Sequence, residues 1–176
     1  MEERFSEEIF EVYDEHGNKV GLAPRAVCHG NPRLIHRTAH VIVFNARGEL
    51  LLQKRSAQKD IQPGKWDTAV GGHLAPGESW EQAAEREMQE ELGVRPATPL
   101  RFLLTAKIRN AIESEDVGVF TTVHNGPFSP PPNEVADLRF WTSRQIREAQ
   151  GTGCFTPSLE SELRQLFAAG LLVEPT

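Results

Sequence analysis

The sequence predicts an α/β fold in which a mixed β-sheet lies between helices and follows a short N-terminal hairpin. Three observations predict it. Apolar runs with high strand propensity fill the first part of the chain, one strongly periodic helix follows them, and further strands and helices come after that helix. Strands on both sides of a helix form a sheet whose faces must be buried, and the helices supply the cover.

The first part of the chain predicts two hairpins. Residues 9–13 form a short β-prone run, the turn residues 14–18 follow, and a second apolar stretch completes a small N-terminal hairpin. Residues 40–44 and 50–53 are apolar runs that flank the turn signal at 45–48. Because such residues join antiparallel strands, we expect a second hairpin there.

A loop and the best helix of the sequence come next. Residues 57–72 are rich in proline, glycine and lysine, which predicts a loop crossing an edge of the core before a short strand at 68–70. Over residues 79–92 the apolar positions recur at helical spacing, and the first residue can form a capping box with Gln82. Gly93 is expected to end this helix.

The last part of the chain alternates strands and helices. Strand-like runs occupy residues 100–108, 117–123 and 138–141. Two further helices are expected at 143–149 and 157–169. These elements supply the remaining strands of the sheet and part of its helical cover.

The length of the chain limits the number of domains, and its net charge limits the classes of binding partner. The chain has 176 residues, which fits one domain over residues 1–176, with a core at about 36–170 and an N-terminal β extension at about 8–35. The formal net charge is −6 and the sequence pI is about 5.5. No general polyanion-binding surface is expected, so nucleic acid polymers are not expected as partners.

Cysteine usage and the N-terminus suggest a cytoplasmic protein. Only Cys28 and Cys154 are present, without the spacing of a disulfide framework or a zinc site. The N-terminus is acidic where a signal or transit peptide would be basic, and no apolar run approaches the ~20 residues of a membrane helix. We therefore expect a reducing compartment and no membrane.

The main helix carries a cluster of carboxylates. Glu87, Glu90 and Glu91 stand at i, i+3 and i+4, so they share one face within a single turn. The alternative interpretation is a solvated acidic face. A glycine-containing loop before the helix, with Gly71 and Gly72, favours a site, because its backbone can approach a ligand. Oxygen ligands of this kind suit Mg²⁺ or Mn²⁺, the usual partners of phosphates.

These residues resemble a known motif. The chain fits the Nudix box G-x5-E-x7-R-E-U-x-E-E-x-G-U at all nine specified positions, from Gly72 to Val94. Resemblance to the Nudix family implies an α/β/α sandwich and hydrolysis of a diphosphate linked to another moiety. It also implies that the three glutamates bind metal and take part in catalysis, one of them as a base, while Arg86 orients them and Glu78 supports the loop. The alternative for Arg86 is a helix-surface partner of a glutamate.

A second resemblance covers most of the chain. From about Ile9 to Pro157, and most clearly over residues 36–79, the chain is similar to the Nudix branch that contains type I isopentenyl diphosphate isomerase and its uncharacterised hydrolase-like relatives. That isomerase holds a metal with three histidines and two glutamates, which correspond here to His29, His36, His73, Glu113 and Glu115. The resemblance implies a second metal site, suited to Mn²⁺ or Zn²⁺. The alternative is a scaffold inherited without metal.

One departure from the isomerase decides between reactions. Gly71 stands where the isomerase carries its catalytic cysteine, so the proton donor or acceptor needed to isomerise a double bond is missing. The isomerase does not keep the full glutamate cluster of the box, whereas all three glutamates are present here. The sequence therefore favours a hydrolase of a small organic or nucleoside diphosphate derivative. An isomerase-like enzyme and a non-catalytic binding module remain as alternatives.

Further residues are candidates for substrate binding. A basic stretch before an aromatic residue could receive a phosphate or a base, although a solvated face beside a buried tryptophan is the alternative. Glu134 and Asp137 resemble a downstream acidic position of several Nudix enzymes. The oligomeric state is open, with a homodimer among the alternatives. The predicted substrate-binding residues are Lys54, Arg55, Lys59, Trp66, Gly71 and Gly72.

Overall fold

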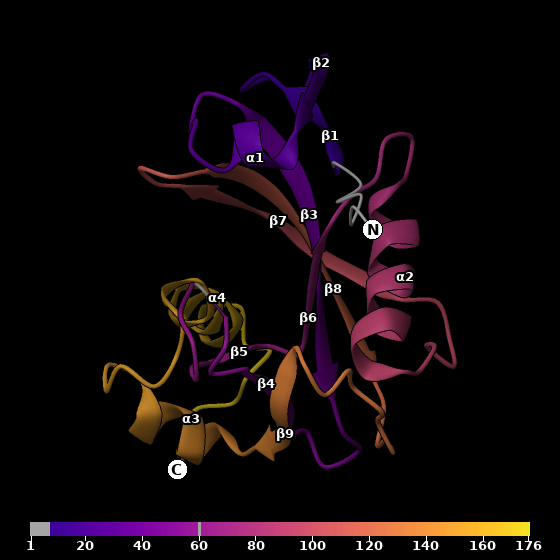
Figure 1. Ribbon diagram of the computed structural model, residues 1–176. Helices are drawn as coiled ribbons and strands as arrows, with labels where there is room; N and C mark the ends of the chain where they lie inside the picture. Colours follow the sequence, from indigo (N-terminus) through magenta and orange to yellow (C-terminus); the bar gives the residue numbers. More distant parts are fainter. Residues whose placement is uncertain (1–7, 60) are drawn as a thin grey trace.

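The computed structural model describes residues 8–59 and 61–176, and the acidic segment before residue 8 lies outside them. Within these residues the chain forms one mixed sheet (Figure 1). Its strands are β1 (Ile9–Tyr13), β2 (Lys19–Pro24), β3 (Ile35–Phe44), β4 (Leu50–Arg55), β5 (Trp66–Thr68), β6 (Val70–His73), β7 (Arg101–Arg109), β8 (Ser114–Val123) and β9 (Val135–Trp141).

Strand β3 is the hub of the sheet. It pairs in parallel with β8 along its whole length, from Ile35 opposite Ser114 to Phe44 opposite Val123. It also pairs antiparallel with β6 and, at single positions, with β1 and β4. Parallel and antiparallel pairs in one sheet confirm the predicted mixed topology, and β1 and β2 form the predicted N-terminal hairpin.

The second predicted hairpin is wrong in its extent. β3 and β4 pair only at Phe44 opposite Leu50. Beyond this pair β3 continues against β6 and β8, whereas β4 continues against β5 and β9. The turn residues place the reversal correctly, but each strand finds its partners far away in the sequence, which local turn chemistry does not encode.

Two short elements also differ from the prediction. The segment expected to be a loop with one short strand at 68–70 holds two strands, β5 and β6, and β5 forms because Trp66 pairs with Lys54 and is buried. A single helical turn, α1 (Arg25–Cys28), precedes β3 and was not predicted. The remaining helices are α2 (Trp80–Leu92), α3 (Ser143–Ala149) and α4 (Pro157–Ala168), close to the predicted ranges. None of the helices in the described residues is long and apolar enough to cross a membrane.

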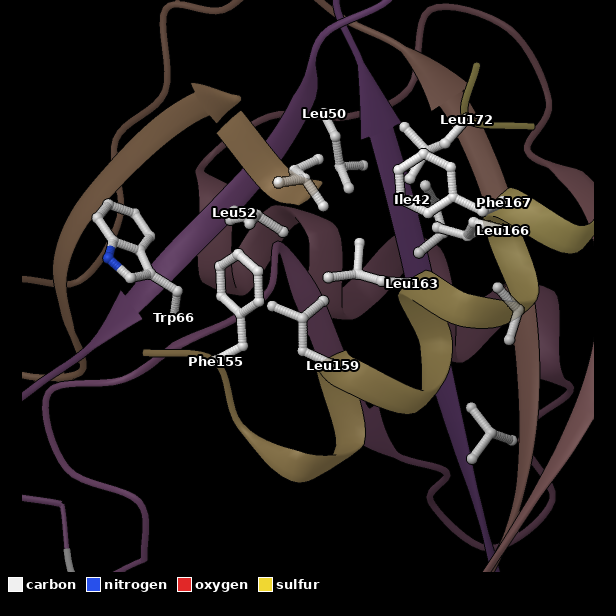
Figure 2. Close-up of a cluster of buried hydrophobic side chains, with 13 residues drawn as sticks. Ile42, Leu50, Leu52, Trp66, Phe155, Leu159, Leu163, Leu166, Phe167 and Leu172 are labelled. Atoms are coloured by element: carbon white, nitrogen blue, oxygen red, sulfur yellow. The ribbon is translucent and has the colours of Figure 1, made fainter. Parts of the chain in front are cut away.

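Helices cover both faces of the central strands. α2 lies on one side of β3 and β6 and α4 on the other (Figure 1). Ala39 and Val41 of β3 pack in the cluster that contains Met88 of α2. Ile42, which points to the opposite face, lies in the cluster that contains Leu163 and Leu166 of α4 (Figure 2). The sandwich is therefore confirmed, and we call its two sides the α2 face and the α4 face of the sheet.

Candidate functional site

The glutamates of α2 are positioned by the local signals that start and end this helix. Ser79 accepts a hydrogen bond from the backbone N–H of Gln82, whose side chain accepts from the Ser79 backbone in return. Gly93 ends the helix in the left-handed conformation at φ 70°. With both ends fixed and its apolar stripe buried, α2 holds its carboxylates at set positions beside β6.

Two of the three glutamates are directed onto β6. Glu91 Oε2 accepts a hydrogen bond of 2.8 Å from the backbone N–H of Gly71. The carboxyl of Glu87 lies so close over Gly72 that a Cβ at that position would be 2.1 Å from Glu87 Cδ. The third, Glu90, has a side chain that is 58% exposed. Gly72 therefore allows the close approach that brings Glu87 to the strand.

Burial controls the charge of these carboxyls. Burial raises the pKa of Glu91 to about 8, although the Gly71 N–H lowers it in part. Burial also raises the pKa of Glu87, against the lowering effect of Arg86. Glu134 adds to the rise at Glu91 through its negative charge. Carboxylates held together in this way favour a bound cation, since a cation offsets both their burial and their repulsion.

Arg86 links the glutamates to the preceding loop. Its Nε and Nη2 donate to the two carboxyl oxygens of Glu78, each at 2.8 Å. Its Nη1 donates to Glu87 at 2.7 Å and to Glu90 at 3.2 Å, and its Nη2 donates to the His73 carbonyl at 3.0 Å. These bonds raise the pKa of Arg86 and lower that of Glu78. The structure thus brings the predicted arginine and its glutamates together in one network.

Four of the five residues of the predicted second site also come together. One ligand atom from each of His29, His36, His73 and Glu115 lies within 4.8 Å of the others. Glu115 Oε1 is 3.1 Å from His36 Nε2 and 3.5 Å from His73 Nε2. The fifth residue, Glu113, is outside this group of four and lies 3.5 Å from His29 Nε2.

The donor set of this His-Glu cluster fits a metal ion. The nitrogens His29 Nε2 and His73 Nε2 are buried without a hydrogen-bond partner among the described residues, and His36 turns its Nε2 toward Glu115. Burial lowers the pKa of His29 to about 4, so its imidazole is in the neutral form that binds metal. Burial alone would raise the pKa of Glu115, but His36 and His73 lower it, which keeps the carboxylate charged. Imidazoles with a carboxylate suit Mn²⁺ or Zn²⁺.

The two groups lie on opposite faces of β6. His73 pairs with Thr38 of β3, and Gly71 pairs with His40, so all four positions belong to the α4 face. Gly72 belongs to the α2 face, where Glu87 lies against it. β6 pairs only with β3 among the described strands, and outside this pairing the Gly71 N–H donates to Glu91 of α2. The glutamates of α2 and the His-Glu cluster therefore flank the same strand from its two faces.

The predicted basic and aromatic residues are not in contact with the glutamates of α2 in the described structure. Lys54 pairs with Trp66 on neighbouring strands, and Trp66 is buried at 7% exposure with its ring edge-on to Trp141. Arg55 donates to the Ile61 carbonyl and lies 3.5 Å from Asp67. The Lys59 backbone N–H closes a turn onto Ser56. No described contact joins these side chains to the glutamates of α2, and their role in binding stays a prediction.

Sequence reasoning missed residues that complete the site. Phe10 of β1 is 1% exposed, and its ring stacks on His36 and His73 at centroid distances of 5.0 and 4.4 Å. No motif in the sequence marks His40, although its position four residues after His36 on one strand places both on the same face. Its buried partner Glu162 comes from α4, and no local signal in the sequence links the two.

Comparison with known proteins gives two kinds of relative. The NUDIX domain model matches residues 34–159. A protein named isopentenyl-diphosphate Delta-isomerase from Nocardia farcinica is 36% identical over 166 residues, which cover 90% of this chain and 94% of the relative. A protein named uncharacterized Nudix hydrolase from Listeria monocytogenes is 36% identical over 141 residues, which cover 77% and 79%. Isomerase and hydrolase names therefore both occur among similar sequences.

The fold is similar to solved structures as well. The crystal structure of DR0079 from Deinococcus radiodurans matches with a TM-score of 0.72 at 25% identity, covering 90% of this chain and 98% of that one. The MutT protein from Methanosarcina mazei matches with a TM-score of 0.67 at 18% identity, covering 80% and 96%. At the second identity the likeness concerns the fold alone.

Proposed function

Because this chain belongs to the Nudix family, we propose that it hydrolyses the diphosphate linkage of a small organic or nucleoside diphosphate derivative with the help of divalent metal. The observation that carries the proposal is the complete glutamate set of α2, tied to β6 through Gly71 and Gly72. Clustered and partly buried carboxylates destabilise a helix. A bound cation would offset this cost.

In this proposal Glu87, Glu90 and Glu91 hold Mg²⁺ or Mn²⁺. When bound, such an ion neutralises charge on the diphosphate and favours attack of water on phosphorus. Arg86 fixes Glu87 through its 2.7 Å hydrogen bond, and the Gly71 N–H fixes Glu91. The carboxylates are thereby oriented before the ligand arrives, which reduces the cost of binding it.

We also propose that His29, His36, His73 and Glu115 hold a second ion, Mn²⁺ or Zn²⁺, with Glu113 at its margin. The N-terminal extension takes part, because Phe10 of β1 covers the imidazole rings. For this reason we propose that residues 8–35 and the core at 36–170 act as one domain. Shielding by an aromatic ring limits water around the ligands and strengthens their interaction with the ion.

The experiment that tests hydrolysis is a panel of diphosphates incubated with the protein and Mg²⁺ or Mn²⁺, with products identified by mass. We expect metal-dependent release of a phosphorylated product from at least one compound. Glu87→Gln keeps the side-chain shape but removes a ligand charge, so turnover should fall by about a hundredfold or more. The matched control is Glu85→Gln, an exposed glutamate of the same helix. Near wild-type turnover in Glu87→Gln and Glu91→Gln would contradict the assignment.

The second candidate is isomerisation of isopentenyl diphosphate, which the His-Glu cluster and the names of several relatives favour. Gly71 argues against it, because glycine offers no acid or base at the position of the isomerase cysteine. We expect no allylic isomer and no carbon-bound deuterium after incubation with isopentenyl diphosphate in D₂O. Either product above a control without enzyme would establish the second candidate instead.

A further inference from the structure

A second buried polar group lies on the α4 face, apart from the His-Glu cluster. His40 Nδ1 is 2.7 Å from Glu162 Oε2, and the two side chains are 14% and 10% exposed. Thr68 of β5 donates its hydroxyl hydrogen to Glu162 Oε1 at 2.5 Å. The group thus joins β3, β5 and α4 through one carboxylate. Such a pair is costly to bury, and apolar residues of similar volume often stabilise a fold as well or better.

The position of His40 relates it to the His-Glu cluster. His36, Thr38 and His40 alternate along β3 and therefore point to the same face. Thr38 donates to Glu115 Oε2 at 3.3 Å, so it stands between the His-Glu cluster and His40. The polar part of β3 on this face ends at His40, because Ile42 belongs to the apolar core. A ligand of the His-Glu cluster that extends along the strand reaches His40 next.

Gly71 leaves room for that ligand beside His40. The two residues are paired neighbours on β6 and β3. A Cβ at position 71 would be 3.2 Å from His40 Nε2 and 3.1 Å from its Cδ2, so any side chain there would crowd the ring. Among the described residues His40 Nε2 has no hydrogen-bond partner, and the His40 side chain is 14% exposed. Within 4 Å that Cβ at position 71 would meet only atoms of the His40 ring, so the glycine leaves unfilled space beside Nε2.

The charge of His40 suits an anionic ligand. Burial alone would lower the pKa of His40, but the charge and hydrogen bond of Glu162 raise it to about 9, with smaller effects from Asp67 and Glu115. The ring is then a cation at neutral pH, with Nδ1–H donated to Glu162 and Nε2–H free to donate. Hydrogen bonds from a charged donor to a phosphate oxygen are stronger than neutral ones.

We infer that His40, held by Glu162, contacts the substrate and donates a hydrogen bond from Nε2 to an oxygen of a diphosphate that lies over Gly71 beside the His-Glu cluster. The inference rests on the proposed function, since it takes the ligand to be a diphosphate. It gives Gly71 a positive role, because the side chain missing from this position makes room for the ligand. The competing explanation is a structural ion pair that only fastens α4 to the sheet.

The test measures binding of methylenediphosphonate in the presence of Mn²⁺, because this P–C–P compound cannot be hydrolysed. His40→Ala should weaken its binding about tenfold, as expected for loss of one charge-assisted hydrogen bond. Gly71→Ala should also weaken it, and in the His40→Ala background it should add little. Gly21→Ala is the matched control, because no atom lies within 4 Å of a Cβ at that strand glycine. Mn²⁺ binding without the diphosphonate should be unchanged in His40→Ala.

A second readout does not depend on the variants folding well. In protein labelled with ¹⁵N-histidine, the His40 ring signals should shift when the diphosphonate is added, whereas a purely structural ion pair would leave them unmoved. Equal dissociation constants in the wild type, His40→Ala and Gly71→Ala, with no shift of His40, would overturn the inference. So would failure of the wild type to bind the diphosphonate at millimolar concentration. Binding that depends on His40 without hydrolysis of any diphosphate would support the inference and contradict the proposed function.

Discussion

Glu91 illustrates how one residue connects the helix, the neighbouring strand and the chemistry. Its carboxyl is held by the Gly71 N–H, and burial raises its pKa to about 8. In the unfolded chain the same group titrates near its ordinary value of 4.5. A carboxyl with a raised pKa disfavours the folded state more and more as the pH rises from the unfolded value to the folded one.

Replacing Glu91 should therefore stabilise the metal-free protein in alkaline solution. Gln resembles the protonated carboxyl, so Glu91→Gln should change Tm little at pH 4.5 and raise it by about 5 °C or more above pH 8. The measurement is thermal unfolding in a chelator across this pH range. Glu85→Gln, on the exposed side of α2, should give no such trend. A constant difference between Glu91→Gln and the wild type at every pH would contradict the burial of a charge at this position.

His36 allows a test of the second metal site at the same scale. Its side chain is fully buried, and one of its nitrogens has no partner. His36→Ala should lower the Mn or Zn content of protein purified without added metal, because a ligand is lost. Elemental analysis checks this, with His124→Ala as the control for loss of a histidine elsewhere. Equal content in both variants, or no metal in either after Mn²⁺ or Zn²⁺ is supplied, would reduce the cluster to an inherited scaffold.

Individual residues were predictable from sequence to different degrees. The glutamates of α2 follow from helical spacing alone, because i, i+3 and i+4 share a face. The His-Glu cluster follows only from resemblance, since His36 and Glu115 meet through the parallel pairing of β3 with β8. Glu162 could not be predicted, because its contact with His40 spans two elements that are far apart in the sequence.

At the scale of elements, local chemistry predicts where a helix begins and ends better than it predicts which strands pair. α2 begins and ends where its capping box and Gly93 indicate, because those signals act within a few residues. The early separation of β3 and β4 and the extra strand β5 depend on pairing with distant strands. The contact between α2 and β6 likewise joins elements that local signals do not connect, and it depends on Gly72, which lets Glu87 approach the strand.

Gly72 should tolerate no side chain. A Cβ there would be 2.1 Å from Glu87 Cδ, so Gly72→Ala must move the carboxyl or the strand. We expect a loss of stability of about 1–3 kcal/mol, typical of overpacking, and a large loss of turnover. Thermal unfolding and activity assays check both, with Gly21→Ala expected to be near neutral because its Cβ would meet nothing within 4 Å. Wild-type Tm and turnover in Gly72→Ala would show that the close approach of the Glu87 carboxyl to residue 72 is not required for stability or activity.

At the scale of the whole molecule, the sheet separates two kinds of ligand and brings them to one strand. The glutamates come from α2 on one face, whereas the imidazoles and Glu115 lie on the other. The fold class follows from the order of strands and helices, because a sheet flanked by sequence-distant helices has few stable arrangements. The meeting of both groups at β6 depends on its pairing with β3, and a glycine-rich segment of four residues does not encode that pairing.

This arrangement predicts two separable contributions of metal to stability. An ion that binds only the folded state at a hundred times its dissociation constant stabilises it by ~2.7 kcal/mol, or about 5–10 °C in Tm for a chain of this size. Titration with Mn²⁺ should therefore raise Tm in two increments if the two faces bind separate ions. Glu91→Gln should remove mainly one increment and His36→Ala mainly the other, because the residues lie in different groups. The double variant should respond little to Mn²⁺. Loss of the whole response in either single variant would indicate one shared ion at the edge of β6 instead of two.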